Sequence, residues 1–374
     1  MDQLKERLSR HRLWLWVLGR YKRHEQYVPL LSFVLGFLWD SLTLSRIDRF
    51  RDNLILSFYL IFLTSCLILT HLGRIPNRLS VRWSRYKKFY PLGIQFFQGG
   101  LFSAYVIYYS QSASLSKNLW FVVLLGVLWT LSEFLQYHLG DLRLQLALYY
   151  LLSHSFFAFF LPILFKKTGY WMFFGAGVVS FVLLGLVLTV FWRTGVISHW
   201  RSLGASIALA LGLFLGLDGL YRANLIPPVP LSLKTAGVYH KVEKKGDAYF
   251  LEYEPPDWYQ FWRKRSWEFH FVEGRDRLVG FTAIFAPDGI EQEILENWYW
   301  WDPALDNWRL MDSHPYKITG GRAFGWRNYY VKRFVKPGLW RVEVEDEEGK
   351  LLGDFDFELQ IVKERPAPLA VRVQ

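Results

Sequence analysis

Seven long apolar runs lie within the first 222 residues of the chain, and the rest of the chain contains none. A helix needs about 20 apolar residues to cross the roughly 30 Å hydrocarbon core of a membrane. The runs are residues 28–44, 53–72, 90–110, 119–138, 143–165, 170–192 and 203–222. This pattern predicts an α-helical transmembrane bundle of about seven helices within residues 28–222.

The run at 28–44 is the weakest of the seven, because Asp40 interrupts it. It is interpreted either as a crossing helix or as a re-entrant or interfacial segment. Before it, residues 1–27 carry seven basic residues together with Trp14 and Trp16, and they lack the cleavage-site pattern of a signal peptide. This segment is interpreted either as a basic amphipathic helix on the inner membrane surface or as a solvated tail.

The distribution of basic residues predicts the orientation of the bundle, because cytoplasmic loops accumulate Lys and Arg. With the N-terminus inside, the inner segments hold sixteen basic residues and the short outer loops hold six. We therefore expect a cytoplasmic N-terminus, and seven crossings then place the C-terminal part outside. If the run at 28–44 does not cross, the side of the C-terminal part depends on the other six runs.

After the last run the pattern changes to short segments in which apolar and polar residues alternate. Residues 223–236 form a proline-rich linker that favours extended chain over a continuing helix. Residues 237–362 alternate with a period of two between turns rich in Gly, Pro and Asp, and residues 363–374 form a tail. This pattern predicts an all-β, immunoglobulin-like antiparallel sandwich.

The net charge of +11 does not indicate a nucleic-acid partner once its distribution is considered. Residues 1–222 carry 23 basic and 9 acidic residues, whereas residues 223–374 carry 21 basic and 24 acidic residues. The excess lies in the membrane half, where the orientation of the helices explains it. Cys66 lies in the second run, so the C-terminal part has no cysteine and no disulfide.

Three stretches of the C-terminal part resemble a known family. They read NWYWWD, WRLMDSHPYKITGGRAFGWRNYY and KPGLWRVEVEDEEGKLLGDFDF, and together they are similar to the bacterial domain of unknown function 2914 (DUF2914). The stretch SFVLGFLWDSLTLSRIDRFRDN resembles the membrane portion of longer members. The resemblance implies a multi-pass protein of the bacterial inner membrane with a periplasmic C-terminal domain, and it implies no activity.

The densest group of candidate binding residues is aromatic: Trp298, Tyr299, Trp300, Trp301 and Trp308. Successive side chains of a strand face opposite sides, so Trp298 and Trp300 are expected on one face and Tyr299 and Trp301 on the other. An exposed aromatic pair suits stacking on sugars or contact with a protein. The alternative is that core or linker covers both faces.

A second candidate group interleaves basic and aromatic residues in GGRAFGWRNYYVKRFVK. Arginine binds carboxylate or phosphate in a bidentate manner, so this segment suits an anionic glycan or a lipid head group. The alternative is a sheet edge on which basic residues prevent pairing with another strand. The candidate residues are Arg322, Trp326, Arg327, Tyr329 and Tyr330.

Ionisable residues within the predicted spans form a third group, because such residues are costly in a membrane and mark functional sites. Ionisable residues at several depths of a membrane suit a path for protons or ions. The alternative is that these residues form ordinary hydrogen bonds between helices. The residues are Asp40, Glu133, His138, His154 and Asp218.

No motif in the sequence indicates an enzyme, a cofactor or a metal site. Phosphate-binding, dinucleotide-binding, metalloprotease and serine-hydrolase signatures are absent from the sequence, and His240, His270 and His314 show no metal-ligand spacing. We therefore expect a scaffold, accessory or assembly subunit whose partners are the lipid membrane and another membrane or envelope protein. The alternatives are an envelope glycan-binding module and a small-solute or ion transporter.

Overall fold

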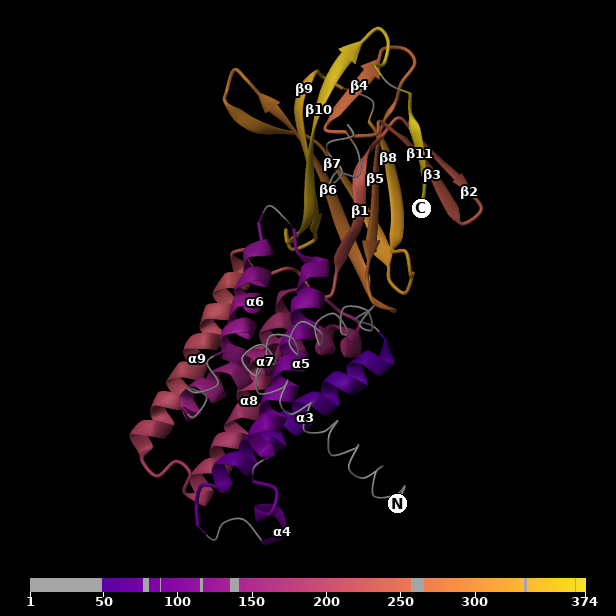
Figure 1. Ribbon diagram of the computed structural model, residues 1–374. Coiled ribbons are helices and arrows are strands. Elements are labelled where there is room, and N and C mark those ends of the chain that lie inside the picture. The colour runs from indigo at the N-terminus through magenta and orange to yellow at the C-terminus, as the bar shows by residue number, and fades with distance from the viewer. Residues whose placement is uncertain are drawn as a thin grey trace, which may run out of the picture.

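The chain is represented by a computed structural model that describes residues 49–76, 81–87, 89–114, 117–134, 141–256, 266–332, 335–366 and 368–374. A bundle of helices comes first along the chain, and a domain of β-sheets stacks on one end of it (Figure 1). We call this the sheet end of the bundle and the opposite end the far end. The short helix α4 (Val81–Ser84) lies at the far end (Figure 1).

The helices of the bundle follow the predicted apolar runs. Besides α4, the structure describes α3 (Phe50–Leu72), α5 (Tyr90–Ser112), α6 (Leu119–Phe134), α7 (Leu142–Phe165), α8 (Tyr170–Thr194) and α9 (Trp200–Arg222). Of these, α3, α7, α8 and α9 are each long and apolar enough to cross a membrane. The predicted segments 1–27 and 28–44 lie outside the described residues, as does the end of the run at 119–138.

Burial divides the long apolar helices into central and peripheral ones. Among the four, α7 is the most buried and α9 the least. Aromatic rings fill the centre, as where Phe159 of α7 lies 4.8 Å from Tyr109 of α5 between ring centroids. Large apolar side chains such as Phe62, Leu186 and Leu215 also cover the outside of the bundle. An apolar outer surface of this kind suits lipid rather than water as its surroundings.

The strands form three sheets. They are β1 (Ser232–Tyr239), β2 (Lys241–Lys245), β3 (Ala248–Tyr253), β4 (Glu268–Val272), β5 (Leu278–Phe285), β6 (Glu291–Asp302), β7 (Asn307–Thr319), β8 (Trp326–Lys332), β9 (Gly338–Asp346), β10 (Leu351–Val362) and β11 (Ala370–Val373). The orders are β1-β5-β8, β4-β10-β9-β6-β7 and β11-β3-β2. The alternating pattern therefore predicts the β-rich nature of this part correctly.

The five-stranded sheet and the β1-β5-β8 sheet share a core built from alternate residues of their strands. On β9 the side chains of Trp340, Val342 and Val344 point into it and are fully buried, while charged residues between them face outward. Strand β5 is buried along its whole length because both of its faces are covered: Leu278 and Ile284 lie in the core shared with the five-stranded sheet, whereas Phe281 and Ala283 pack in a cluster with residues of β3. Trp340 stacks on Phe357 of the neighbouring β10 with the rings nearly parallel. The period of two thus separates core from surface.

Three details of the sheets differ from the prediction. Strands β4 and β10 pair in parallel, so the prediction of a purely antiparallel sandwich is wrong at this pairing. Two strands can pair in parallel when a long connection brings the second back beside the first. The local sequence pattern of either strand does not show whether its partner runs parallel or antiparallel. Strand β1 begins within the predicted linker, and β11 forms within the predicted tail by pairing with β3.

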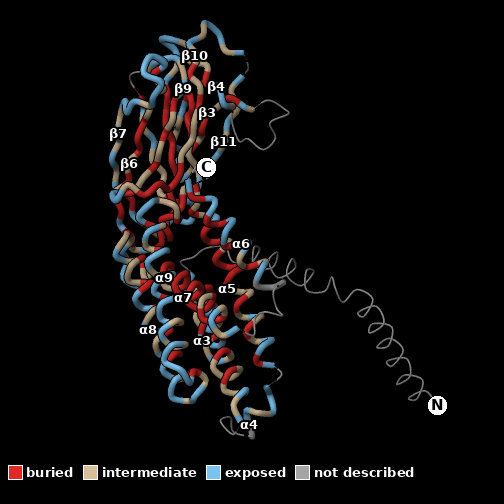
Figure 2. The backbone as a smooth tube through the Cα atoms, turned by 90° about the vertical axis from the view of Figure 1, so that its left-hand side faces the viewer, coloured by how far each residue is buried: buried red, intermediate tan, exposed pale blue. Residues whose placement is uncertain are grey.

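The proline-rich segment between the two parts is a buried joint. Ile226 and Val229 pack with the core of the bundle, whereas Leu231 packs with the core between the sheets. Buried residues accordingly continue through the junction (Figure 2). Because its apolar side chains are divided between both cores, the joint holds the sheet domain against the bundle.

The turn between β9 and β10 contacts the ends of two helices at once. Glu348 Oε2 accepts a hydrogen bond of 2.7 Å from the backbone N–H of Tyr170, the first residue of α8. Lys350 Nζ donates to the carbonyls of Tyr221 (2.9 Å) and Arg222 (3.3 Å), the last residues of α9. An acid at a helix N-terminus and a base at a helix C-terminus both match the helix dipole. We call Glu348 and Lys350 the turn clamp.

Asp346 fixes the shape of the turn that carries the clamp. Its Oδ1 accepts hydrogen bonds from the backbone N–H groups of Glu348 (2.9 Å) and Lys350 (2.8 Å). Burial raises the pKa of Asp346 to about 6, although these two hydrogen bonds oppose the shift. Further contacts across the junction join Ser114 to Asp354, Thr168 to Gln292 and Asn224 to the carbonyl of Gly349.

Candidate functional site

The two faces of β6 have different surroundings. Trp298 is fully buried in the core, and Trp300 packs against that core from its edge. Tyr299 and Trp301 lie on the opposite face and are half-buried. The strand therefore provides one aromatic pair to the core and leaves the other on the outer face of the five-stranded sheet.

We define the aromatic face as Tyr299, Trp301, Trp308, Leu310 and Arg341. The rings of Trp301 and Trp308 meet edge to face with centroids 5.3 Å apart. The guanidinium of Arg341 lies 4.6 Å from the ring centroid of Trp308. Its Nε and one Nη each donate a hydrogen bond of 2.8 Å to the Asp356 carboxylate. Leu310, opposite Tyr299 on β7, is 55% exposed. The face thus combines held aromatic rings with an open aliphatic side chain.

The aromatic face continues onto the tip of the β6–β7 hairpin. The last residue of β6 that pairs with β9 is Trp300, and beyond it β6 continues with β7 alone in the described structure (Figure 1). Leu305 in the connecting turn is 65% exposed. The hydrogen bond from Arg309 lowers the pKa of Asp302 and joins the two strands behind this turn. The hairpin therefore presents apolar side chains on a tied two-stranded ribbon.

The basic and aromatic residues predicted around β8 do not gather at one place. Arg322 lies over Trp326 at 4.0 Å, and Trp326 packs against the core between the sheets. Arg327 instead lies over the ring of Tyr249, 4.8 Å away, and donates to the carbonyl of Gln374. Within the described structure, β8 is an edge strand that pairs with β5. Arg327 thus holds β8 to β3 and to the C-terminal residue, whereas Arg322 covers a ring of its own segment.

The other two candidates of this segment also separate. Tyr329 faces outward and is exposed. Tyr330 donates a hydrogen bond of 2.7 Å to Asp312 of β7, which also pairs with Lys332 at 3.0 Å. The ring of His314 stacks on Tyr330. Tyr330 is therefore part of a polar contact that joins the edge of the five-stranded sheet to the edge of the β1-β5-β8 sheet.

Glu296 is a buried carboxyl that the sequence analysis did not select. It lies on β6 with no exposed surface, and its Oε1 accepts a hydrogen bond of 3.0 Å from the indole N–H of Trp298. A side chain on Gly280 of β5 would overlap both, since a Cβ there meets Trp298 at 2.5 Å and Glu296 at 2.8 Å. Burial raises the pKa of Glu296 to about 7, although hydrogen bonds from Trp298 and Thr282 oppose the shift. Glu296 therefore changes charge near neutral pH inside the core.

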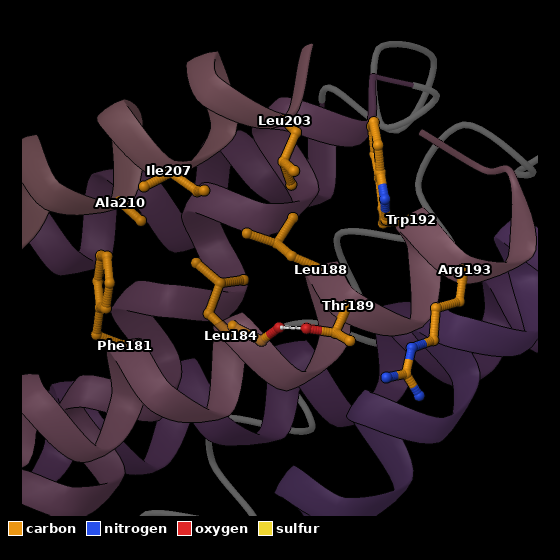
Figure 3. A pocket seen from close by; sticks show the side chains of 10 residues that line it. Phe181, Leu184, Leu188, Thr189, Trp192, Arg193, Leu203, Ile207 and Ala210 are labelled. Carbon is orange, nitrogen blue, oxygen red and sulfur yellow. Dashed lines mark hydrogen bonds between the residues drawn. The ribbon is translucent and has the colours of Figure 1, made fainter. Parts of the chain in front are cut away.

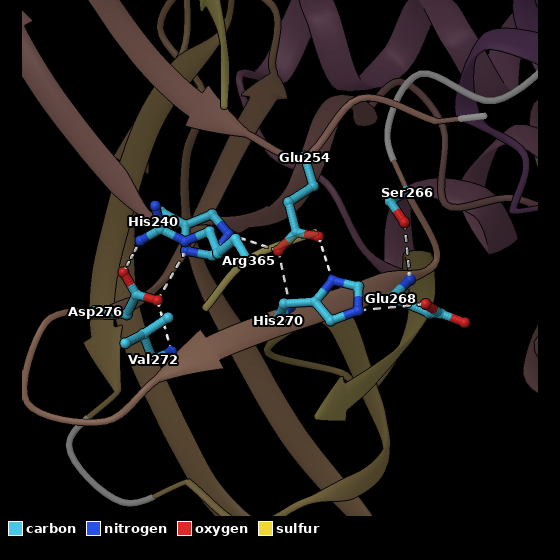
Figure 4. A network of polar contacts seen from close by, with 8 residues as sticks. All are labelled: His240, Glu254, Ser266, Glu268, His270, Val272, Asp276 and Arg365. Carbon is cyan, nitrogen blue, oxygen red and sulfur yellow. Dashed lines mark hydrogen bonds and ion pairs between the residues drawn. The ribbon is translucent and has the colours of Figure 1, made fainter. Parts of the chain in front are cut away.

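A second polar network ties the distal corner of the sheet domain (Figure 4). The carboxylate of Glu254 lies 2.9 Å from His240 Nε2 and 2.6 Å from His270 Nδ1, and it accepts the backbone N–H of His270. Asp276 lies 3.7 Å from His240 Nδ1 and also pairs with Arg365. Burial opposes ionisation of Glu254, but the hydrogen bonds from the two histidines outweigh it and lower its pKa. The network holds β3 and β4 to the chain that follows β10.

The residues predicted within the membrane are dispersed. His154 of α7 is buried among aromatic rings, with Phe173 at 4.7 Å, and neither ring nitrogen has a hydrogen-bond partner. Asp218 of α9 pairs with Arg222 one turn later, near the sheet end. Asp40, His138 and the side chain of Glu133 lie outside the described residues. Across the described part of the chain, no three His, Cys, Asp or Glu residues form a group that could hold a metal ion.

A cavity of about 340 Å³ lies between α8 and α9 in the half of the bundle toward the far end (Figure 3). Its apolar lining comes from Phe181, Leu184 and Leu188 of α8 and from Ile207 and Ala210 of α9. Trp192 and Arg193 lie at one end of it (Figure 3). No sequence motif marked this cavity, because its lining has the composition of any apolar helix pair.

Comparison with known proteins gives a match to one family model, and the solved structures that align with the chain include one of low similarity. No curated protein matches the chain. Among solved structures, Pseudomonas fluorescens alkylpurine DNA glycosylase AlkC bound to DNA containing an abasic site analog aligns at 12% identity and a TM-score of 0.20, covering 84% of this chain and 99% of that one. Residues 291–359 match the family described as protein of unknown function (DUF2914). The region from β6 to β10, which carries the aromatic face and the turn clamp, is therefore a DUF2914 region, as its motifs predict.

Proposed function

We propose that this protein is a scaffold, accessory or assembly subunit of a membrane or envelope protein complex. In this proposal a bundle of about seven crossing helices lies in the bacterial inner membrane with the N-terminus in the cytoplasm. It anchors an immunoglobulin-like sandwich in the periplasm. The sandwich offers its aromatic face and the hairpin tip to a protein partner.

The ends of α8 support a membrane-crossing bundle. Trp171 at the sheet end and Trp192 at the far end are both exposed. Tryptophan is enriched at the two interfaces of a membrane. Trp192 follows Trp171 by 21 positions, which span about 31 Å as a helix and match the hydrocarbon thickness.

Loop charge supports the orientation of the bundle. The loop between α3 and α5 lies at the far end and holds six basic residues from Arg74 to Lys88. The short loop between α7 and α8 at the sheet end holds Lys166 and Lys167. The bias favours a cytoplasmic far end and a periplasmic sheet end.

The observation that carries the proposed role is the exposed apolar tip of the β6–β7 hairpin. Leu305 and Leu310 are more than half exposed beside the rings of Trp301 and Trp308. Protein interfaces are centred on aromatic anchors surrounded by apolar contacts. The tip is also held at its base by the sheet, which lowers the entropy lost when a partner binds.

The aliphatic and cationic neighbours of the rings favour a protein over a glycan. A sugar-binding site offers an open indole face for stacking, but the guanidinium of Arg341 already lies over Trp308. Arg341 is in turn held by Asp356, so it does not leave this position without breaking two hydrogen bonds. Leucine side chains offer sugars no hydrogen bonds.

The test is quantitative mass spectrometry of proteins that co-purify with the full-length protein from native membranes in mild detergent. We expect a stoichiometric protein partner with the unaltered chain and its loss in a Leu305→Glu/Leu310→Glu variant. The control is Val371→Glu/Val373→Glu, which charges two equally exposed apolar residues on β11. Retention of the partner by the hairpin variant, or the absence of any stoichiometric protein, would reject the proposal.

A further inference from the structure

We propose that the cavity between α8 and α9 binds one acyl chain of an anionic phospholipid, with the lipid phosphate on Arg193. The inference depends on the bundle crossing the membrane. It does not depend on the partner-binding role of the sheet domain.

The shape of the cavity matches a lipid chain in one leaflet. Its lining on α8 runs from Phe181 at the middle of the helix to Trp192 near its far end. Eleven residues of helix span about 16 Å, and half of a 30 Å hydrocarbon core is about 15 Å. The cavity therefore has the length of a single leaflet and lies in the leaflet at the far end.

The cavity has a buried floor and an open rim. Leu184, Leu188 and Ala210 form the buried floor, whereas Ile207 at the rim is 41% exposed. The one hydroxyl of the lining, on Thr189, donates to the carbonyl of Gly185 in its own helix (Figure 3). Between Phe181 and Thr189 no side-chain polar group of α8 is thus left to bind a polar solute, and the open rim admits an apolar chain from the side.

The charge at the end of the cavity fits a phosphate. Arg193 is exposed, and none of the ion pairs or hydrogen bonds among the described residues uses its guanidinium. Trp192 beside it and Trp200 at the start of α9 are both exposed at the same level, where head groups lie. An arginine at this depth binds a phosphate in a bidentate manner while the acyl chain enters the cavity.

Gly185 gives a way to close the cavity without disturbing the helix. It lines the cavity, and a Cβ added there meets no atom within 4 Å. Gly204 on α9 also has open space around its Cβ but does not line the cavity. Gly185→Leu therefore fills the site, and Gly204→Leu is its matched control.

The experiment places full-length protein in lipid nanodiscs that contain phosphatidylglycerol with a photoreactive diazirine on one acyl chain. Mass spectrometry then maps the adducts after irradiation. We expect adducts concentrated between residues 181–188 and 203–210, and a loss of about tenfold for Gly185→Leu but none for Gly204→Leu. Phosphatidylcholine with the same label is expected to react less than phosphatidylglycerol. Arg193→Gln is expected to remove this difference between the two lipids. Arg143→Gln, at the start of α7 and at the far end of the bundle, is expected to keep it.

Three outcomes would overturn the inference. Adducts spread evenly over all lipid-facing helices would mean that the cavity holds no preferred chain. Equal labelling of Gly185→Leu and unaltered protein would mean that the chain lies elsewhere. Equal labelling by phosphatidylglycerol and phosphatidylcholine would mean that Arg193 does not select an anionic lipid. The absence of adducts from every helix would reject the membrane-crossing bundle itself, whereas the first three outcomes leave the bundle in place.

Discussion

The two ends of strand β6 differ in what holds them. Near its start Gln292 accepts a hydrogen bond from Thr168 in the bundle, and at its other end Trp301 lies on a hairpin that extends past the sheet. Between them Trp298 is locked in the core. A domain that is fixed to the bundle at one side and open at the hairpin tip suits a binding element held at a set distance from the bundle.

This comparison predicts that substitutions near the bundle change stability and substitutions at the hairpin tip change binding. The largest effect is expected for Lys350→Met. This change removes a buried ammonium from the carbonyls of α9 and leaves Asp346 without its nearby positive charge, so we expect a loss of about 4 kcal/mol. Chemical unfolding of the full-length protein in detergent, followed by near-ultraviolet circular dichroism, measures the loss. Lys363→Met changes an exposed lysine, and an equal loss there would contradict the role of the clamp.

The next effect concerns the pH dependence set by Glu296. Its pKa is about 7 in the folded chain and about 4.3 in the unfolded chain, so the stability it contributes is complete below pH 4.3 and is lost as the pH rises through 7. We expect a decrease of about 4 kcal/mol over this range, and Glu296→Gln is expected to abolish it. Unfolding at a series of pH values measures the slope. Glu291→Gln on the exposed start of the same strand should retain it.

A smaller effect of opposite sign is expected at Glu254. Its pKa is lowered in the folded chain, so its contribution is present above the unfolded pKa of about 4.3 and is lost as the pH falls through the folded pKa. Glu254→Gln is expected to cost about 2 kcal/mol at pH 7, the strength of charged hydrogen bonds. Hydrogen exchange at the backbone N–H of His270, which donates to Glu254, reports the change directly. Unchanged protection in the variant would contradict the network.

The smallest change in stability is expected at the hairpin tip. Leu305→Ser/Leu310→Ser alters side chains that are already more than half exposed, so the free energy of unfolding should stay within about 0.5 kcal/mol. The same unfolding measurement checks this expectation. A loss comparable to that of Lys350→Met would mean that the tip is part of the core and would remove the contrast between the two ends.

Strand positions in the sheet domain can be predicted because a period of two is local information. The alternation of Trp298 with Tyr299 follows from it, and so does the hairpin of β9 and β10. The parallel pairing of β4 with β10 cannot be predicted this way, since it depends on where a long connection returns. The extra residue Met311, which interrupts the register of β7 opposite β6, cannot be predicted from the period of two either.

Candidate sites were harder to predict because contacts join residues that are distant in the sequence. Arg322 and Arg327 are only five positions apart in the chain. Arg322 nevertheless covers Trp326, whereas Arg327 donates to the carbonyl of the C-terminal residue. In the sequence, Glu296 is an ordinary polar residue of a strand. Its burial depends on the close approach of Gly280 on β5, which is a contact between distant parts of the chain. Glu348 and Lys350 are typical turn residues, and only the stacking of the domain on the bundle reveals their partners.

The turn clamp also has a consequence for biosynthesis. Lys350 follows Arg222 by 128 residues, and Glu348 follows Tyr170 by 178. Because the ribosome makes the chain from its N-terminus, α8 and α9 are synthesised long before the residues that cover their ends. A nascent chain that stops before Lys350 leaves the last carbonyls of α9 without this partner. Synthesis past Lys350 therefore changes the ends of α8 and α9 themselves, so a nascent chain that lacks the turn differs there from one that contains it.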